Sequence, residues 1–208
     1  MVPDFVSISF RSAANAFNRS LGILQPYVNM EGYNEANLTL RFSHALLALG
    51  ADVFHEIPIG KVQRLDILAF LDGVCLRVEA KQLHRETIKQ RERNSIVADS
   101  KRLSELSTSS LIERLRGSSN LAVVGCYDVL LCDCWADADS DWWMGNQSAR
   151  PNWDRAFLSE YTVSSIPLPH KCGNPSPEQY HWLIGVRPSL VDSPRQTVAA
   201  LQPLISPA

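Results

Sequence analysis

Two acidic residues and a lysine, Asp66, Glu79 and Lys81, have the types and spacing needed for chemistry on a phosphate group. Twelve residues separate the two acids, and the lysine follows Glu79 after a single residue. Carboxylate oxygens are the protein ligands that Mg²⁺ prefers, and it keeps positions for water and phosphate oxygens. A metal ion held in this way activates water and stabilises charge on a phosphate, so the three residues suggest metal-assisted hydrolysis.

A predicted hairpin brings the two acids together. Asp72-Gly73 lies between two apolar segments, 64–71 and 74–83, and this dipeptide favours a two-residue turn. Such a turn pairs residues whose numbers sum to 145, so Asp66 should lie opposite Glu79. Like charges in that position repel each other. Lys81 could offset the repulsion as a structural ion pair, but a divalent cation would do so more fully.

The same register separates two faces of the hairpin. Alternate side chains point to opposite sides of a strand. One face is predicted to be apolar and buried, with Leu65, Ile67, Ala69 and Leu71 against Val74, Leu76, Val78 and Ala80. The other face carries Arg64, Asp66, Leu68 and Phe70 against Cys75, Arg77, Glu79 and Lys81. The acids and the lysine therefore share a face.

A third acid, Glu35, is predicted on the helix that precedes the hairpin. Asn34 is a suitable N-cap, Gly50 a suitable end, and apolar residues recur between them at helical spacing. Glu35 falls on that apolar face and so points towards the sheet, where a charge needs a partner. A glutamate in a first turn is also favoured by the helix dipole alone, which is the competing explanation.

Asp66 followed by Glu79-Ala80-Lys81 resembles the PD-(D/E)xK motif of the restriction-endonuclease-like nuclease superfamily. The expected order of elements over residues 34–132 resembles that superfamily's αβββαβ core, and Glu35 matches an acid often found on its first helix. Leu65 stands where the motif's name has proline, and the helix after the motif shows no QxxxY signature. The resemblance leaves the last third of the chain unexplained.

The resemblance implies a divalent-metal-dependent nuclease, most simply one that cuts DNA. Asp66, Glu79 and the Ala80 carbonyl would bind Mg²⁺ or Mn²⁺, and Glu35 would reach the same ion through water or hold a second one. Lys81 would orient and help deprotonate the attacking water. Two alternatives remain open: a catalytically inactive module of the same fold that binds nucleic acid or protein, and RNA as the substrate.

A basic segment next to the motif is the predicted nucleic-acid contact. Between Lys81 and Arg116 there are nine Lys or Arg and five Asp or Glu, although the whole chain has a formal charge of −2. Four side chains are the candidates to follow a phosphate backbone: Lys89, Arg93, Lys101 and Arg102. For each of them singly, an ordinary solvated helix face explains the charge equally well.

The remaining pattern predicts an α/β fold, with a central mixed sheet flanked by helices. Helices are expected at 7–21 and 96–116, and strands at 52–59, 121–132 and 181–186. Residues 133–160 are expected to be an acidic loop with at most a short helix at 153–161, and residues 166–177, with four prolines, a loop. We expect one domain over residues 1–187 (core 34–132, C-terminal elaboration 133–187) and a proline-punctuated tail at 188–208.

Bulk composition narrows the class of protein. The chain has 208 residues, of which 45% are hydrophobic and 20% charged, as in ordinary globular proteins. No apolar run approaches the length of a membrane span, and the odd number of cysteines favours free thiols in a cytoplasmic protein. Because cutting both strands of DNA with so small a domain requires two copies, a homodimer is expected.

Overall fold

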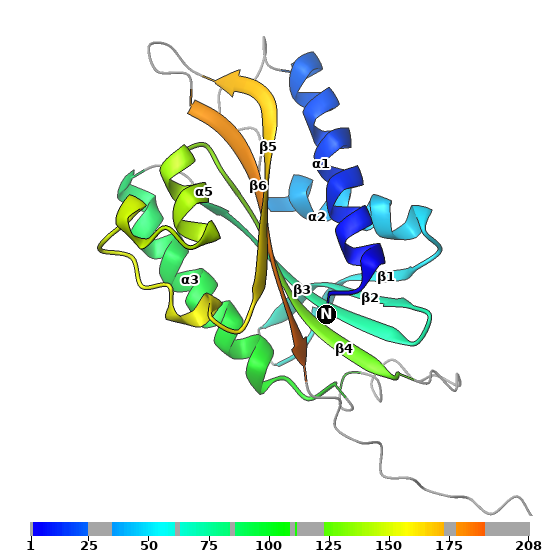
Figure 1. Cartoon of the computed structure of the whole chain (residues 1–208). Coiled ribbons are helices and arrows are strands. Elements are labelled where there is room, and N and C mark those ends of the chain that lie inside the picture. The colour runs from blue at the N-terminus through cyan, green and yellow to red at the C-terminus, as the bar shows by residue number, and fades with distance from the viewer. Residues whose placement is uncertain are drawn as a thin grey trace, which may run out of the picture.

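The computed structural model describes residues 2–24, 35–60, 63–83, 86–108, 111, 123–172 and 178–189. Its centre is a six-stranded sheet of order β1-β2-β3-β4-β6-β5 with helices on both faces (Figure 1). The strands are β1 (Asp52–Pro58), β2 (Arg64–Leu71), β3 (Val74–Leu83), β4 (Gly125–Cys134), β5 (Thr162–Cys172) and β6 (Glu178–Ser189). The helices are α1 (Asp4–Leu24), α2 (Glu35–Ala48), α3 (Glu86–Glu105), α5 (Asp137–Met144) and two 3₁₀ turns, η2 (Gln147–Ala149) and η3 (Ala156–Leu158). Because β3 and β4 are parallel and the other neighbours antiparallel, the sheet is mixed, as predicted.

The predicted hairpin is confirmed. Asp72 and Gly73 both have positive φ, 49° and 79°, which is the backbone of the tight turn that matches strand twist. Leu71 pairs with Val74, and the ladder continues in the predicted register as far as the Ile67–Val78 pair. The spacing of the residues on β2 and β3 is therefore set locally, by a turn that only a few residue types accept.

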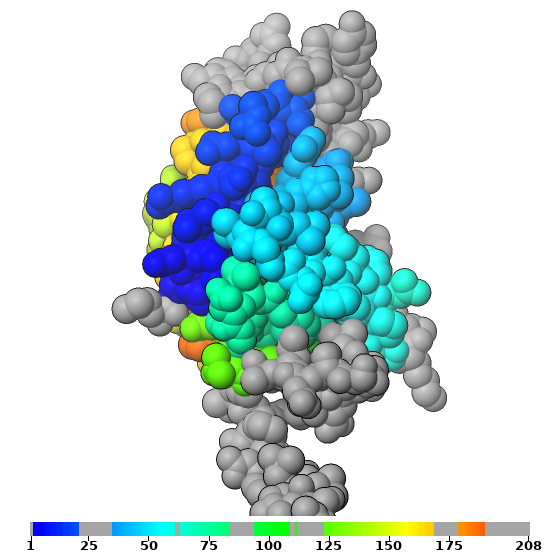
Figure 2. All heavy atoms as spheres, turned by 90° about the vertical axis from the view of Figure 1, so that its right-hand side faces the viewer, coloured from blue at the N-terminus to red at the C-terminus, as the bar shows by residue number. Residues whose placement is uncertain are grey.

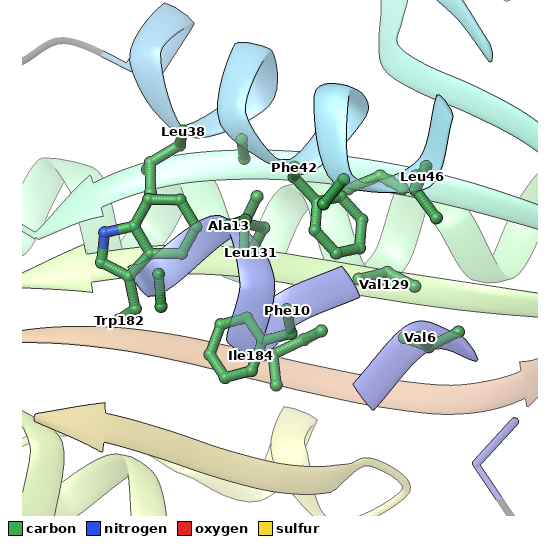
Figure 3. Close-up of a cluster of buried hydrophobic side chains, with 14 of the residues drawn as sticks. Val6, Phe10, Ala13, Leu38, Phe42, Leu46, Val129, Leu131, Trp182 and Ile184 are labelled. Carbon is green, nitrogen blue, oxygen red and sulfur yellow. The ribbon is translucent and has the colours of Figure 1, made fainter. Parts of the chain in front are cut away.

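Helices α1 and α2 cover one face of the sheet and lie side by side there (Figure 2). Figure 3 shows how Phe10 of α1 and Phe42 of α2 point into the same cluster as strand residues such as Leu131 and Ile184. Gly50 was predicted to close this helix, and it does so in a turn just after α2, with a φ of 89°. The Ala51 amide donates to the Leu46 carbonyl across that turn. This core fixes α2, and with it Glu35, against the sheet; Asn34 lies outside the described residues.

Helices α3 and α5 cover the opposite face (Figure 1). Ile96 and Leu103 of α3 and the fully buried Trp142 and Trp143 of α5 pack in a second cluster with residues of β2, β3, β4 and β6. Leu65 was predicted on the same face as Ile67 and Ala69, which pack in the first cluster, but it belongs to this second cluster. The regular alternation of β2 side chains between the two faces of the sheet is therefore broken at the start of the strand, next to Asp66.

Several predicted elements need correction. Helix α3 begins ten residues before the predicted start and ends at Glu105, while β4 runs from Gly125 rather than over 121–132. The run predicted as an acidic loop contains α5, closed by Gly145 with φ 119°. The segment predicted as a proline-rich loop is largely β5, which is an edge strand, and an edge tolerates residues that lack an N–H.

The C-terminal region continues the sheet rather than forming a separate layer. Strands β6 and β5 extend it beyond β4, and β6 reaches Ser189, so the first two residues of the predicted tail are strand. The rest of the tail, 190–208, lies outside the described residues. Within the described part of the chain, no helix is both long and apolar enough to cross a membrane. Four cysteines there, Cys75, Cys126, Cys132 and Cys134, are buried free thiols.

Candidate metal site

The candidate site lies where β2 separates from β3. The β2–β3 ladder stops at Ile67–Val78, while β3 stays paired with β4 as far as Leu83. Beyond that point the Ala80 amide donates to Asp66 Oδ2 at 2.7 Å, so a carboxylate takes the place of a backbone partner. One side of β3 next to Glu79 is thereby opened to side chains. Asp66 and Glu79 lie on neighbouring strands, as predicted, but the predicted Asp66–Glu79 pair falls just beyond the end of the ladder.

Lys81 lies between carboxylates that come from opposite faces of the sheet. Its Nζ is 2.9 Å from Glu35 Oε1 on α2 and 3.5 Å from Asp99 Oδ2 on α3. It also donates to the Ala80 carbonyl at 2.8 Å. The amine reaches both helices only because β2 has left this side of β3. The structure therefore brings the predicted Glu35, Ala80 and Lys81 together.

Two residues of α3 enlarge the predicted site. Asp99 is only 4% exposed and pairs with Arg102, whose Nη2 lies 2.8 Å from Asp99 Oδ1 and 2.5 Å from Glu79 Oε1. Asp99 was not among the predicted site residues. Its three-residue spacing from Arg102 is a local signal for an ion pair, but it does not say which side of α3 faces the sheet.

The electrostatics of the site show too much negative charge for its cations. With all four acids ionised, Glu35, Asp66, Glu79 and Asp99 stand against Lys81 and Arg102, an excess of two negative charges. Burial raises the pKa of Glu79 to about 8, and the neighbouring Asp66 charge adds to the effect. Burial also raises the pKa of Glu35 and of Asp99, in spite of the nearby cations.

Lys81 is held in its charged form. Burial opposes the ammonium, but the charges of Glu35, Asp99 and Asp66 outweigh it and raise the pKa of the Lys81 amine. In this arrangement Lys81 acts as a donor to oxygen atoms. As an ammonium, it cannot accept a proton from water.

The carboxylates at the β2–β3 opening are the candidate donors for a divalent metal. Among the residues with described positions, no group of three or more Asp, Glu, His or Cys side chains is preassembled around one point. The donors nevertheless fit Mg²⁺ or Mn²⁺ chemically, because they are carboxylates with a backbone carbonyl nearby. The amine of Lys81 and the guanidinium of Arg102 contact the same oxygens that a metal would use.

The predicted nucleic-acid contacts have different positions. Lys101 is exposed and 3.9 Å from Glu105, one helical turn away, as expected of a solvated helix face. Arg102 instead turns towards the acids of the site. Lys89 and Arg93 lie on α3, but their side chains are outside what the structure describes. Glu56, another acid near the motif, pairs with Arg64 at the surface, 3.8 Å away.

A buried ionic network holds α3 against the sheet. Arg77 is fully buried and its Nε donates to Asp128 Oδ1 at 2.7 Å, while Arg187 Nε donates to Asp128 Oδ2 at 3.0 Å. The two guanidinium groups also donate to carbonyls of α3 and of the residue just beyond it, at Ser100, Leu103 and Leu106. The sequence placed Arg77 on the polar face of the hairpin but gave no sign of this role. The network fixes the position of α3.

No family model, curated protein or solved structure matches the chain in comparisons with known proteins. The architecture that the coordinates establish is an α/β fold with a mixed six-stranded sheet flanked by helices. The side chains gathered at the β2–β3 opening are the basis for assigning a function.

The buried Glu79 carboxylate should lower the stability of the metal-free protein at alkaline pH. Its pKa is about 8 in the folded chain against an ordinary 4.5, so folding favours the protonated form and stability falls as pH rises through this window. We expect Glu79→Gln to raise the stability at pH 8.5 by about 1–2 kcal/mol, or roughly 2–8 °C in Tm. Thermal unfolding in EDTA measures the difference, which should vanish at pH 5.

A Tm difference that stays the same at both pH values would show that the amide acts through packing rather than through the charge of Glu79.

Proposed function

We propose that the protein is a divalent-metal-dependent nuclease with a restriction-endonuclease-like core, and that its substrate is DNA. The observation that supports this most directly is the opening between β2 and β3, where Asp66, Glu79 and Lys81 meet acids from helices on both faces of the sheet. An ordinary structural ion pair needs one acid and one base. Four acids around two bases leave a charge that a divalent cation would neutralise.

Each residue has a role that its surroundings support. Asp66, Glu79 and the Ala80 carbonyl would hold Mg²⁺ or Mn²⁺, and Glu35 would contribute to the same ion or to a second one. A bound metal supplies activation of water and stabilisation of charge on the phosphate. Lys81, as an ammonium, would donate to a phosphate oxygen and orient the water. The reaction is hydrolysis of a phosphodiester bond, which yields an alcohol and a phosphate monoester.

The test is nicking of supercoiled plasmid by the purified protein with Mg²⁺ or Mn²⁺, with EDTA, and with the Glu79→Gln variant. Cleavage should require the metal and be lost in the variant. In wild-type protein at pH 8.5, Mg²⁺ should also raise Tm, because it neutralises the excess charge; Glu79→Gln should show a smaller rise. A single-stranded RNA substrate run in parallel tests the other nucleic acid.

Equal nicking by wild type and variant, or nicking in EDTA, would contradict the proposal. If the wild type cuts both strands, size-exclusion chromatography with and without DNA tests the homodimer that such cleavage requires.

One observation favours a second function, a nucleic-acid-binding or protein-binding module that does not cut. Lys81 and Arg102 already pair with the acids, and the described side chains form no preassembled metal cage. Under this alternative, the protein would bind DNA in a mobility-shift assay equally well in EDTA and in Mg²⁺, and it would leave both nucleic acids intact.

A further inference from the structure

Asp99 connects the two cations of the site. One of its oxygens, Oδ1, lies 2.8 Å from Arg102 Nη2, and the other, Oδ2, lies 3.5 Å from Lys81 Nζ. The side chain is 5% exposed, so water does not screen either interaction strongly. A single carboxylate on α3 therefore sets the separation between an amine on β3 and a guanidinium on its own helix.

The other partners of these cations are residues that would bind the metal in the proposed site. Lys81 also contacts Glu35 and the Ala80 carbonyl, and Arg102 also contacts Glu79. Once a divalent ion binds those oxygens, it repels both cations and competes for their partners. Asp99 is then the group that keeps the ammonium and the guanidinium in place.

Arg102 has donor capacity left for a ligand. Its Nε is buried and has no hydrogen-bond partner among the described residues, while a quarter of the side chain remains exposed. A buried N–H without an acceptor destabilises the structure, and an anionic oxygen would satisfy it. A guanidinium matches the geometry of a phosphate, to which it can donate two parallel hydrogen bonds.

On this geometry, and resting on the proposed nuclease function, we infer that Asp99 is a positioning residue that holds Lys81 and Arg102 against the scissile phosphate. Asp99 does not touch the substrate. It acts through the two cations, which donate to phosphate oxygens from the β3 side and from the α3 side. The site would then have two parts, a metal-binding part on the hairpin and a phosphate-holding part organised from α3.

The test compares Asp99→Asn, Asp99→Glu and the wild type in Mg²⁺-dependent plasmid cleavage. We expect Asp99→Asn to lower kcat about 10–100-fold, with the Mg²⁺ midpoint and the KM for DNA changed less than about threefold. Asp99→Glu, which keeps the charge, should recover part of the loss. Glu105→Gln, which breaks an exposed pair on the same helix, is the control and should leave kcat within about twofold.

Coupling to Lys81 separates positioning from a general loss of structure. In a Lys81→Met background, Asp99→Asn should reduce cleavage by a smaller factor than it does in the wild type, because one of the two cations that Asp99 holds is gone. If the double variant lost cleavage rate by the full product of the two single reductions, the inference would be overturned. A weaker Mg²⁺ midpoint as the main effect would also overturn it, since Asp99 would then be a metal ligand.

Tm provides a measurement that does not depend on nuclease activity. In metal-free protein, the combined Tm change of Asp99→Asn and Lys81→Met should differ from the sum of the single changes, because the residues are in contact. If the wild type does not cleave, the proposed function fails while this coupling still tests the contact. Additive Tm changes would contradict the positioning role whatever the activity shows. Asp99→Glu replaces Asp99→Asn in the cycle if the asparagine variant does not fold.

Discussion

Replacing Lys81 by methionine is expected to lower the rate of DNA cleavage by about 10²–10⁴-fold, the range for losing a positioned proton-transfer or charge-stabilising group. Methionine keeps much of the apolar stem but removes the ammonium that lies between Glu35, Asp99 and the Ala80 carbonyl. The proposed metal ligands stay in place, so Mg²⁺ should still bind, and with the ammonium gone its apparent affinity should rise. Single-turnover cleavage and Mg²⁺ titration by calorimetry measure the two quantities.

Lys101→Met is the matched comparison, because it removes the same group from an exposed position on α3. If Lys101 contacts the phosphate backbone, as the sequence predicts, its loss should weaken DNA binding and reduce the salt dependence of binding, with kcat nearly unchanged. If Lys81→Met instead changed only KM, Lys81 would be a binding residue like Lys101, and its assignment to the chemical step would be wrong.

Replacing Asp128 by alanine is expected to destabilise the protein by about 3–5 kcal/mol, which is the usual cost of removing one partner from a buried ion pair. Arg77 would remain buried without the carboxylate that offsets its charge, and of its described ion-pair partners Arg187 would keep only the exposed Glu160, 3.0 Å away. Urea unfolding followed by tryptophan fluorescence measures the loss. Activity should fall with it at temperatures near the new Tm, because the same two arginines hold the carbonyls of α3.

The control for this variant is Asp141→Ala, at an exposed aspartate on α5, which should change stability by no more than about 0.5 kcal/mol. A second variant, Arg77→Met combined with Asp128→Leu, replaces one charged pair by apolar groups and should recover part of the loss. Stability within 1 kcal/mol of wild type for Asp128→Ala would mean that water reaches the arginines, and that the network is less important than its burial indicates.

The hairpin and α2 could be predicted because their signals are local. Asp72-Gly73 fixes a turn, the turn fixes a register, and the register places Asp66 and Glu79 on facing strands. The same reasoning found the face of α2 that carries Glu35. In each case, neighbouring residues alone determine the geometry.

The contribution of α3 could not be predicted because it depends on packing between distant segments. The charges of α3 indicate a solvated basic face when only the sequence is considered. In the structure, Arg77 and Arg187, from two different strands, bind carbonyls of α3 and of the residue just beyond it. These contacts orient the helix so that Asp99 and Arg102 face the sheet. The C-terminal strands were harder still. Prolines in β5 indicate a loop unless it is known that β5 is an edge strand, and edges are a property of the whole sheet.

β3 lies inside the sheet, so the site residues on this strand are more constrained in position than the site residues on the helices. Glu79 and Lys81 stay in register with β4 along ten consecutive pairs, so neither can move without sliding a whole ladder. The helical residues depend on side-chain contacts, which can be exchanged one at a time. Under the proposed function, selection or engineering for a new substrate should therefore reshape the helices first and leave Glu79 and Lys81 in place.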